Sequence, residues 1–317
     1  MFKGSKKYVV WIGSVLFLCT LCFVSYQYVK NNKDDLVIVR VDGGICSQIG
    51  FCGLGHELSQ KGYKVKYDLS WFQKDGKDNN GIFARNYDMQ RAFPNLKFEE
   101  ATEEEIKLYA KKYRILADDV GKFSPPMYVD GYPERYSYFI KYRDFFIKNF
   151  VPGDIYKIKD ILHEIESCNA CAVHVRRGDL SGFDKVSYPG YGAPCSVDYF
   201  LRAIKIMISI CDKQPKFFFF SDEPNWVKDN IIPKLDKDVE YYVCEKNGSD
   251  AGYLDLYLIS KCKQFICSIG SLGFFGRALS RNNGYLITPI SRVEFANAFD
   301  NCVILFNKIE TKTSLKE

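Results

Sequence analysis

The 317-residue chain lacks a strong excess of charge of either sign, and this limits the partners it could have. Its formal net charge is only +5, and no run of basic residues with interleaved aromatic side chains occurs. Surfaces that bind nucleic acids are usually far more basic than this. We therefore expect no nucleic-acid partner. Internal repeats and low-complexity tracts are also missing, so the fold has to be inferred segment by segment.

Clusters of metal-ligating residues are missing too. Among twelve cysteines, Cys168 and Cys171 form one C-x-x-C pair, and no second pair or histidine cluster completes a zinc site. The single D-x-D, formed by Asp236 and Asp238, lies in a charged segment that we interpret as a solvated loop. We expect no metal and no resident cofactor. The cysteines are expected to be buried thiols or a few disulfides, and they leave the cellular compartment open.

One long hydrophobic run is present near the N-terminus. Residues 8–29 carry no charge and would span about 33 Å as a helix, which is enough to cross a bilayer. Aromatic residues lie near both of its ends, as membrane interfaces favour. No small-x-small cleavage site closes the run, so we predict an uncleaved anchor in the lipid bilayer rather than a signal peptide. Three lysines precede it and two follow, which favours an N-terminus in the cytosol.

A nucleotide-binding type of turn follows the anchor and its short polar stem. Residues 36–41 form an apolar run that predicts a buried strand, then come Gly43 and Gly44, then a helical pattern that continues to Gly62. A strand, two glycines and a helix are typical of the first turn of a nucleotide-binding sheet. Residues 63–67 alternate like a second strand.

The middle of the chain is less regular. Residues 70–98 are predicted to form a long polar loop, and residues 100–117 a charged helix. An aromatic-rich stretch at 128–139 leads into a helix that we expect to carry Tyr138 and Phe139 in the core. A break near 151–154 precedes another helix. We place the domains at 1–35 for the cytosolic stub, anchor and stem, 36–160 for the first α/β domain and 161–317 for the second.

The second half alternates strands with helices, which implies a parallel sheet. The predicted strands are residues 170–175, 216–221, 240–244, 264–267 and 285–288. With 47% hydrophobic residues the chain can bury a core in each half. The fold class is therefore α/β, with two sheets that face each other across a cleft.

Polar side chains lie at the carboxyl ends of three predicted strands of the second half. They are His174, Arg176, Arg177 and Asp179 in the first group, Ser221 and Asp222 in the second, and Ser268 and Ser271 in the third. In a parallel sheet these ends lie along one rim, where ligands bind. Paired arginines suit a diphosphate, and a helix N-terminus suits phosphate oxygens. The rim therefore predicts a nucleotide-diphosphate site, with a surface salt bridge as the simpler alternative for the arginines.

The same residues carry a family resemblance. The order His-Val-Arg-Arg-Gly-Asp (174–179), Phe-Phe-Ser-Asp with Trp226 four residues on, and Asp255-Leu-Tyr-Leu-Ile-Ser-Lys-Cys262 resembles the α-1,2-fucosyltransferases of glycosyltransferase family 11. The likeness runs from Val37 to Pro289. It implies the GT-B fold of two Rossmann-like domains, the donor GDP-β-L-fucose, a galactose-terminated glycan as acceptor, transfer to O-2 with inversion, and no metal.

The resemblance also implies roles for individual residues. Arg176 would hold the β-phosphate with support from Arg177, His174 and Asp222 would contact guanosine, and Ser271 would add a phosphate contact. Gly43 and Gly44 form a turn where the family has a similar feature and are expected to contact the donor, while Tyr132 and Glu134 are expected on the acceptor side. Asp179 is expected to brace the arginines and, as an alternative, to act as the base. The base itself is left open among Asp179, Asp184 and Glu134.

The chain departs from the family pattern in two motifs. Cys46-Ser47-Gln48 stands where the family usually has Gly-Asn-Gln. In the third motif, residues 269–275, the usual asparagine is absent and both tryptophans are phenylalanine. The alternatives are therefore another linkage or acceptor, or a catalytically silent protein that binds a nucleotide sugar or glycan. We expect the catalytic domain in a Golgi-type lumen in a eukaryote, or at the cytosolic face of the inner membrane in a bacterium.

Overall fold

The computed structural model describes residues 35–74, 76, 85–132, 135–178, 194–245, 247, 250–292 and 297–306. Among these residues no helix combines the length and apolar character that a membrane crossing needs. The anchor predicted at residues 8–29 lies outside the described residues and stays a prediction.

The smaller of two sheets is built from the first half of the chain. Its four parallel strands lie in the order β2-β1-β4-β3. They are β1 (Leu36–Arg40), β2 (Lys64–Asp68), β3 (Arg114–Leu116) and β4 (Met127–Asp130). The helices of this half are α2 (Ile45–Gln60), α3 (Ser70–Lys74), α4 (Met89–Ala92), α5 (Glu103–Lys112) and the short 3₁₀ helix η1 (Ala117–Lys122).

Three predictions for this half were incomplete or wrong. The expected loop at 70–98 contains α3 and α4. The expected helix at 100–117 ends at Lys112, and residues 114–116 form β3 instead. β4 was not predicted at all. It lies between β1 and β3 with all four residues buried, so long-range pairing and burial define it, rather than an alternating pattern.

The larger sheet has six parallel strands in the order β10-β9-β8-β5-β6-β7. They are β5 (Ala170–Val175), β6 (Lys216–Ser221), β7 (Tyr241–Cys244), β8 (Gln264–Ile266), β9 (Leu286–Pro289) and β10 (Cys302–Leu305), the last of which was not predicted. Numbered along the chain, this is the 3-2-1-4-5-6 order of dinucleotide-binding sheets. The order reverses between β5 and β8, where such sheets bind their ligands.

Helices cover both faces of the larger sheet. Successive residues of β5 alternate between two apolar clusters, so that Ala172 packs with α12 and α13 while Val173 packs with α10 and α11. The helices are α8 (Lys159–Ser167), α10 (Val197–Ile210), α11 (Pro224–Asn230), α12 (Gly252–Lys261) and α13 (Ser271–Leu279), with short 3₁₀ helices η3 (Ile232–Lys234) and η4 (Ile290–Arg292). Strands with helices on both faces confirm the predicted α/β class.

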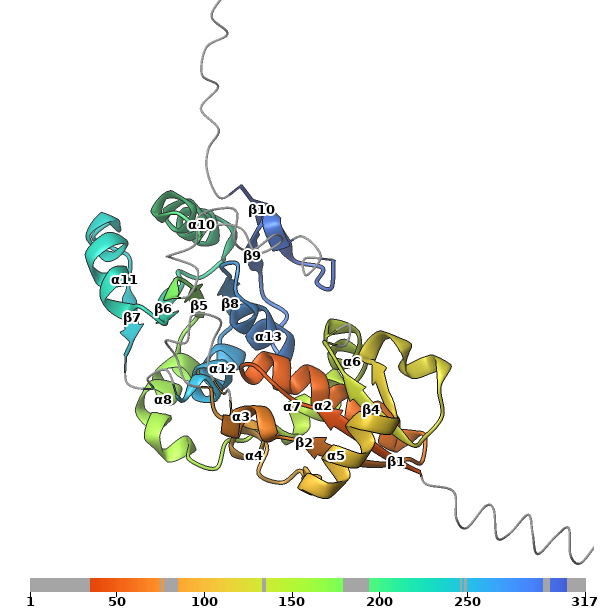
Figure 1. The fold of residues 1–317 in the computed structure, drawn as a ribbon. Coiled ribbons are helices and arrows are strands. Elements are labelled where there is room, and N and C mark those ends of the chain that lie inside the picture. Colours follow the sequence, from red (N-terminus) through yellow and green to blue (C-terminus); the bar gives the residue numbers. More distant parts are fainter. Residues whose placement is uncertain are drawn as a thin grey trace, which may run out of the picture.

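The two sheets occupy separate parts of the molecule, and helices lie between them (Figure 1). The connection runs through α6 (Arg135–Lys141), α7 (Arg143–Asn149) and the 3₁₀ helix η2 (Ile155–Ile158). Phe139, which is buried as predicted, stacks on Phe275 of α13 with 4.5 Å between ring centroids. Phe150 meets Tyr257 of α12 edge to face at 5.2 Å. One apolar core therefore continues from one sheet to the other.

Candidate active site

The arginine pair lies at the point where the strand order of the larger sheet reverses. Arg176 follows β5 directly, and its backbone N–H donates a 2.9 Å hydrogen bond to Oγ of Ser268, which follows β8. The same hydroxyl lies 3.2 Å from Nδ1 of His174. Ser268 thus joins the carboxyl ends of the two strands that border the reversal.

A carboxylate after β6 holds both arginines. Oδ2 of Asp222 lies 2.6 Å from Nη1 of Arg176, and Oδ1 accepts a 2.9 Å hydrogen bond from the backbone N–H of Arg177. Burial raises the pKa of Asp222, and the neighbouring Arg176 opposes this rise. The structure therefore brings the first two predicted strand ends together, with Asp222 as a partner of the arginines that the sequence had suggested only as a guanosine contact.

The side chain of Arg177 is fixed separately. Its Nε donates to Oε2 of Glu223 at 3.2 Å, and its guanidinium lies 3.8 Å from the ring centroid of Trp226 on α11. A guanidinium over an indole ring gains a cation–π interaction and keeps its plane fixed. Both arginines are thus oriented by the turn that joins β6 to α11.

His174 is buried beneath the start of α13. Burial, with a smaller effect from Arg176, lowers the pKa of His174 to about 3, so its ring is uncharged near neutral pH. A Cβ on Gly270 would lie 2.9 Å from Cε1 of His174, and one on Gly273 would lie 2.8 Å from its Cβ. The glycines of the altered third motif therefore allow α13 to approach the strand end closely.

The rest of the third motif fills the junction between the sheets. Ser271 is the first residue of α13, so it lies at the helix N-terminus, as predicted for a phosphate contact. Phe275 stacks on Phe139, and Phe274 meets Phe299 edge to face at 5.5 Å. The two phenylalanines that replace the usual tryptophans thus serve as packing residues.

The glycine turn lies at the carboxyl end of β1 in the smaller sheet. Gly43 has a φ of +76°, which disfavours any other residue, and a Cβ there would lie 3.6 Å from the hydroxyl of Tyr132. Gly44 caps α2 with extended backbone. Gly43 and Tyr132 therefore lie together where β1 and β4 end. Asp42 precedes this turn, and its Oδ1 is buried without a hydrogen-bond partner among the described residues.

One carboxyl group, that of Asp255, was given no role from the sequence, although it begins the motif that ends at Cys262. Asp255 is the only charged side chain between Gly252 and Ser260 in an otherwise apolar helix, α12. Burial raises the pKa of Asp255 to about 7, while a 2.6 Å hydrogen bond from Nδ2 of Asn247 lowers it. A lone acid within an apolar helical pattern was the signal available in the sequence. Asn247 belongs to an Asn-Gly-Ser glycosylation sequon, and its amide nitrogen is the donor in this contact.

Some predicted positions lie outside the described residues, namely Glu134, Asp179 and Asp184. Within the described part of the chain, no group of three or more His, Cys, Asp or Glu side chains is placed to hold a metal ion. Asp236 and Asp238 are both exposed. The ten cysteines that the structure describes are all free thiols.

Comparison with solved structures finds distant likenesses. An Arabidopsis thaliana FUT1 mutant in complex with GDP matches with a TM-score of 0.43 and 9% identity, over 82% of this chain and 72% of that one. A glycosyl transferase family 9 protein from Veillonella parvula matches with a TM-score of 0.44 and 7% identity, over 87% of this chain and 88% of that one.

Two characterised glycosyltransferases are similar to the chain in sequence. An α-1,2-colitosyltransferase of Escherichia coli is 25% identical over 302 residues, which are 87% of this chain and 99% of the relative. The O-antigen biosynthesis glycosyltransferase WbnK of Escherichia coli is 24% identical over 128 residues, which are 40% of this chain and 39% of that protein. The model of glycosyl transferase family 11 matches residues 79–301, most of the chain, and the chain therefore belongs to that family.

Proposed function

We propose that the chain is an inverting glycosyltransferase that moves L-fucose from GDP-β-L-fucose to O-2 of a terminal galactoside without a metal ion. The observation that carries this proposal is the arginine pair Arg176 and Arg177, oriented by Asp222 where the strand order of the larger sheet reverses. Family membership supports glycosyl transfer. The donor, the linkage and the acceptor are our proposals.

The donor side of the mechanism follows from the charges at the rim. When the bond between C1 of the sugar and the β-phosphate oxygen breaks, the electron pair leaves with GDP. Cations that face the developing negative charge lower the barrier. Because folding has already fixed their positions, no free energy is spent on orienting them during the reaction. We assign the β-phosphate to Arg176, with Arg177 in support, and a contact of the phosphates to Ser271. His174, which is uncharged, and Asp222 are assigned to guanosine, and Asp179 is proposed to brace the arginines.

The acceptor side needs a group that receives a proton. O-2 of the acceptor attacks C1 from the face opposite GDP and loses its proton as the new bond forms. We propose Asp42 for this role, because it follows β1, lies directly before the turn of Gly43 and Gly44, and holds a buried oxygen without a described partner. Tyr132 and Glu134 are proposed to bind the acceptor sugar.

Asp42→Asn tests the proposed proton acceptor. We expect kcat to fall by about 100-fold or more, the usual range for loss of a general base, with GDP affinity unchanged. Initial-rate kinetics and calorimetric titration with GDP measure the two quantities. Asp118→Asn, which changes an exposed carboxylate on η1, is the matched control. A kcat within a few-fold of the wild-type value would exclude Asp42 as the base.

The function itself is tested by incubating the full chain with GDP-fucose and a lactose-type acceptor in the presence of EDTA. We expect release of GDP and a product fucosylated at O-2. Absence of GDP release with every galactoside, or a strict requirement for Mn²⁺, would contradict the proposal.

A second candidate donor is an activated colitose. The observation that favours it is the α-1,2-colitosyltransferase, which aligns over 99% of its own length. Competition between GDP-fucose and GDP-colitose for one acceptor separates the two, since the true donor has the higher kcat/KM. Tight GDP binding without turnover of either donor would instead favour the catalytically silent protein that the altered third motif suggests.

The membrane anchor at residues 8–29 remains part of the proposal. It would hold the enzyme at the lumenal face of a Golgi-type membrane in a eukaryote, or at the cytosolic face of the inner membrane in a bacterium. Accessibility of an N-terminal tag and of the catalytic domain to protease in intact vesicles would decide between these orientations.

A further inference from the structure

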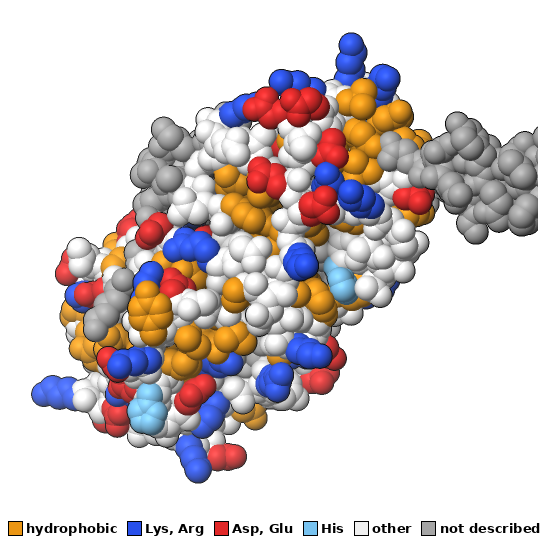
Figure 2. All heavy atoms as spheres, turned by 90° about the horizontal axis from the view of Figure 1, so that it is seen from below, with side chains coloured by type: hydrophobic (Ala, Val, Ile, Leu, Met, Phe, Trp, Pro, Cys, Tyr) orange, Lys and Arg blue, Asp and Glu red, His pale blue; other side chains and the backbone are white. Residues whose placement is uncertain are grey.

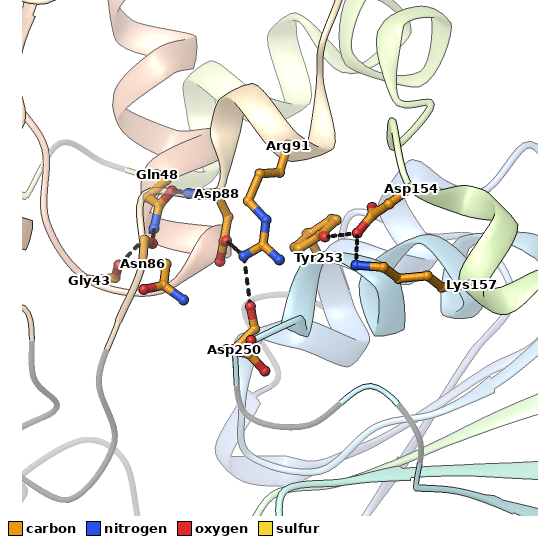
Figure 3. A network of polar contacts seen from close by, with 9 residues as sticks. All are labelled: Gly43, Gln48, Asn86, Asp88, Arg91, Asp154, Lys157, Asp250 and Tyr253. Atoms are coloured by element: carbon orange, nitrogen blue, oxygen red, sulfur yellow. Dashed lines mark hydrogen bonds and ion pairs between the residues drawn. The ribbon is translucent and has the colours of Figure 1, made fainter.

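A buried glutamine ties the glycine turn of the smaller sheet to a second segment. The side chain of Gln48 on α2 is fully buried. Its Nε2 donates to the carbonyls of Gly43 at 3.0 Å and Asn86 at 2.8 Å, and its Oε1 accepts from the backbone N–H of Asp88 at 2.7 Å (Figure 3). Both ends of the amide are thus engaged, and this side chain links the turn to residues 86–88.

An arginine connects that second segment to the larger sheet. Nη1 of Arg91 on α4 donates to Oδ1 of Asp88 at 2.9 Å and to the carbonyl of Asp250 at 2.9 Å. Its guanidinium also lies 4.4 Å from the ring centroid of Tyr253 on α12. Figure 3 shows Arg91 reaching across from one half of the molecule to the other.

The far end of the network is fixed as well. The hydroxyl of Tyr253 donates to Oδ2 of Asp154 at 2.6 Å, and Nζ of Lys157 lies 2.9 Å from the same oxygen. Asp250 belongs to the connection between β7 and α12. This connection leaves the carboxyl end of β7, which pairs with β6, the strand that ends at Ser221 directly before Asp222. The network therefore joins Asp250, which follows β7 of the larger sheet, to the glycine turn of the smaller sheet.

The two halves are also held together by apolar contacts. The halves already share an apolar core in which Phe139 stacks on Phe275. The network also carries an electrostatic cost, because burial raises the pKa of Asp88 to about 6 although Arg91 lies beside it. A polar network that carries such a cost, beside an apolar core that already joins the halves, points to a positioning role.

We propose that Arg91 is a positioning residue that couples the nucleotide site on the larger sheet to the Gly43–Gly44 turn on the smaller sheet. This inference rests on the proposed function, in which the first site binds GDP and the second lies beside the acceptor. When GDP orders the rim, Asp250 and Arg91 hold Asp88 in place, and Gln48 then holds the turn. Such coupling between two sites is reciprocal and typically changes affinity 5–150-fold.

The test compares the full wild-type chain with Arg91→Met and Arg91→Lys. The first readout is hydrogen exchange of the backbone amides of residues 44–48 with and without GDP. The second is the affinity for a galactoside with and without GDP. We expect GDP to protect these amides and to tighten galactoside binding in the wild type. Arg91→Met should lose both effects while its own GDP affinity stays within about twofold. Arg91→Lys should restore part of them, because an ammonium can still reach two oxygens.

The matched control is Arg143→Met. Arg143 on α7 also joins the two halves, through the carbonyls of Ala278 and Ser280, but it has no contact with the glycine turn in the described residues. We expect a lower unfolding temperature with the GDP effects intact. Equal loss of the GDP effects in Arg143→Met and Arg91→Met, or unchanged effects in Arg91→Met, would overturn the proposed coupling.

These experiments test the proposed coupling and the proposed function separately. GDP binding with protection of residues 44–48 but no sugar transfer would contradict the function and support the coupling. Sugar transfer without any GDP-dependent protection in the wild type would support the function and contradict the coupling.

Discussion

Asp222 is the residue that gives the arginine pair its orientation, since it contacts Arg176 through one oxygen and the backbone of Arg177 through the other. We predict that Asp222→Asn weakens GDP binding about tenfold or more, because Arg176 loses a charge-assisted contact, worth about 1.5–3 kcal/mol, that holds it in place. Calorimetric titration measures this, with Asp238→Asn, an exposed carboxylate, as the control. Unchanged or tighter binding would show that Asp222 competes with phosphate for Arg176.

Asp255 predicts a pH dependence of stability. Its pKa is raised to about 7 by burial, so the folded state binds a proton that the unfolded state has already lost above about pH 4. The carboxyl group therefore lowers the free energy of unfolding by more and more as the pH rises from about 4 to about 7. Below about pH 4 it has the least effect. Because the side chain is partly exposed, we expect Asp255→Asn to stabilise the protein by only about 1–2 kcal/mol at pH 8. Denaturant unfolding at pH 8 and pH 4.5 should show a gain only at pH 8.

Single residues could be assigned from the sequence where a strand end and a motif coincided. His174 lies near the end of an apolar strand, Arg176 and Arg177 follow it, and the structure places them together with Ser268 and Asp222. The pairing of Asp222 with Arg176 could not be predicted, because it depends on β5 and β6 being neighbours in register. The same holds for Gln48, whose three partners are up to 40 residues away.

At the scale of elements, the close approach of α13 to β5 depends on small residues. A Cβ at Gly273 would lie 2.8 Å from both Sγ of Cys267 and Cβ of His174. We predict that Gly273→Ala lowers the free energy of unfolding by about 1–3 kcal/mol, as overpacking usually does, and weakens GDP binding by displacing His174. Gly252→Ala on α12, where nothing lies within 4 Å, should leave both unchanged or slightly raise stability. Equal stability of the two variants in denaturant unfolding would contradict this account of the glycine.

The helices and strands that could be predicted are those that a local sequence pattern marks. The apolar runs of β1, β5 and β6 end in polar residues and were recognised within one residue of their bounds. β3, β4 and β10 were not recognised from the sequence, and pairing with neighbouring strands defines them. The helix α5 was recognised, but its end at Lys112 was not, because the charged pattern continues into β3.

At the scale of the whole molecule, the two parallel sheets place their strand ends on separate halves that share one apolar core. Acidic and basic side chains are interspersed on the face seen in Figure 2, as expected for a chain with a small net charge. The α/β class followed from the alternation of segments. The 3-2-1-4-5-6 order, which locates the site between β5 and β8, required the structure, because periodicity does not specify which strands are neighbours.

The central claim is that Arg176 binds the diphosphate of the donor, and GDP affinity measures this most directly. Calorimetric titration of the metal-free full chain should show GDP binding in the wild type. It should be weakened about 100-fold or more in Arg176→Ala, because two charge-assisted hydrogen bonds are lost. Arg202→Ala, which removes a guanidinium paired with Asp198 on α10, should bind GDP like the wild type. Near-equal GDP affinity of Arg176→Ala and the wild type, with both folded, would contradict the account.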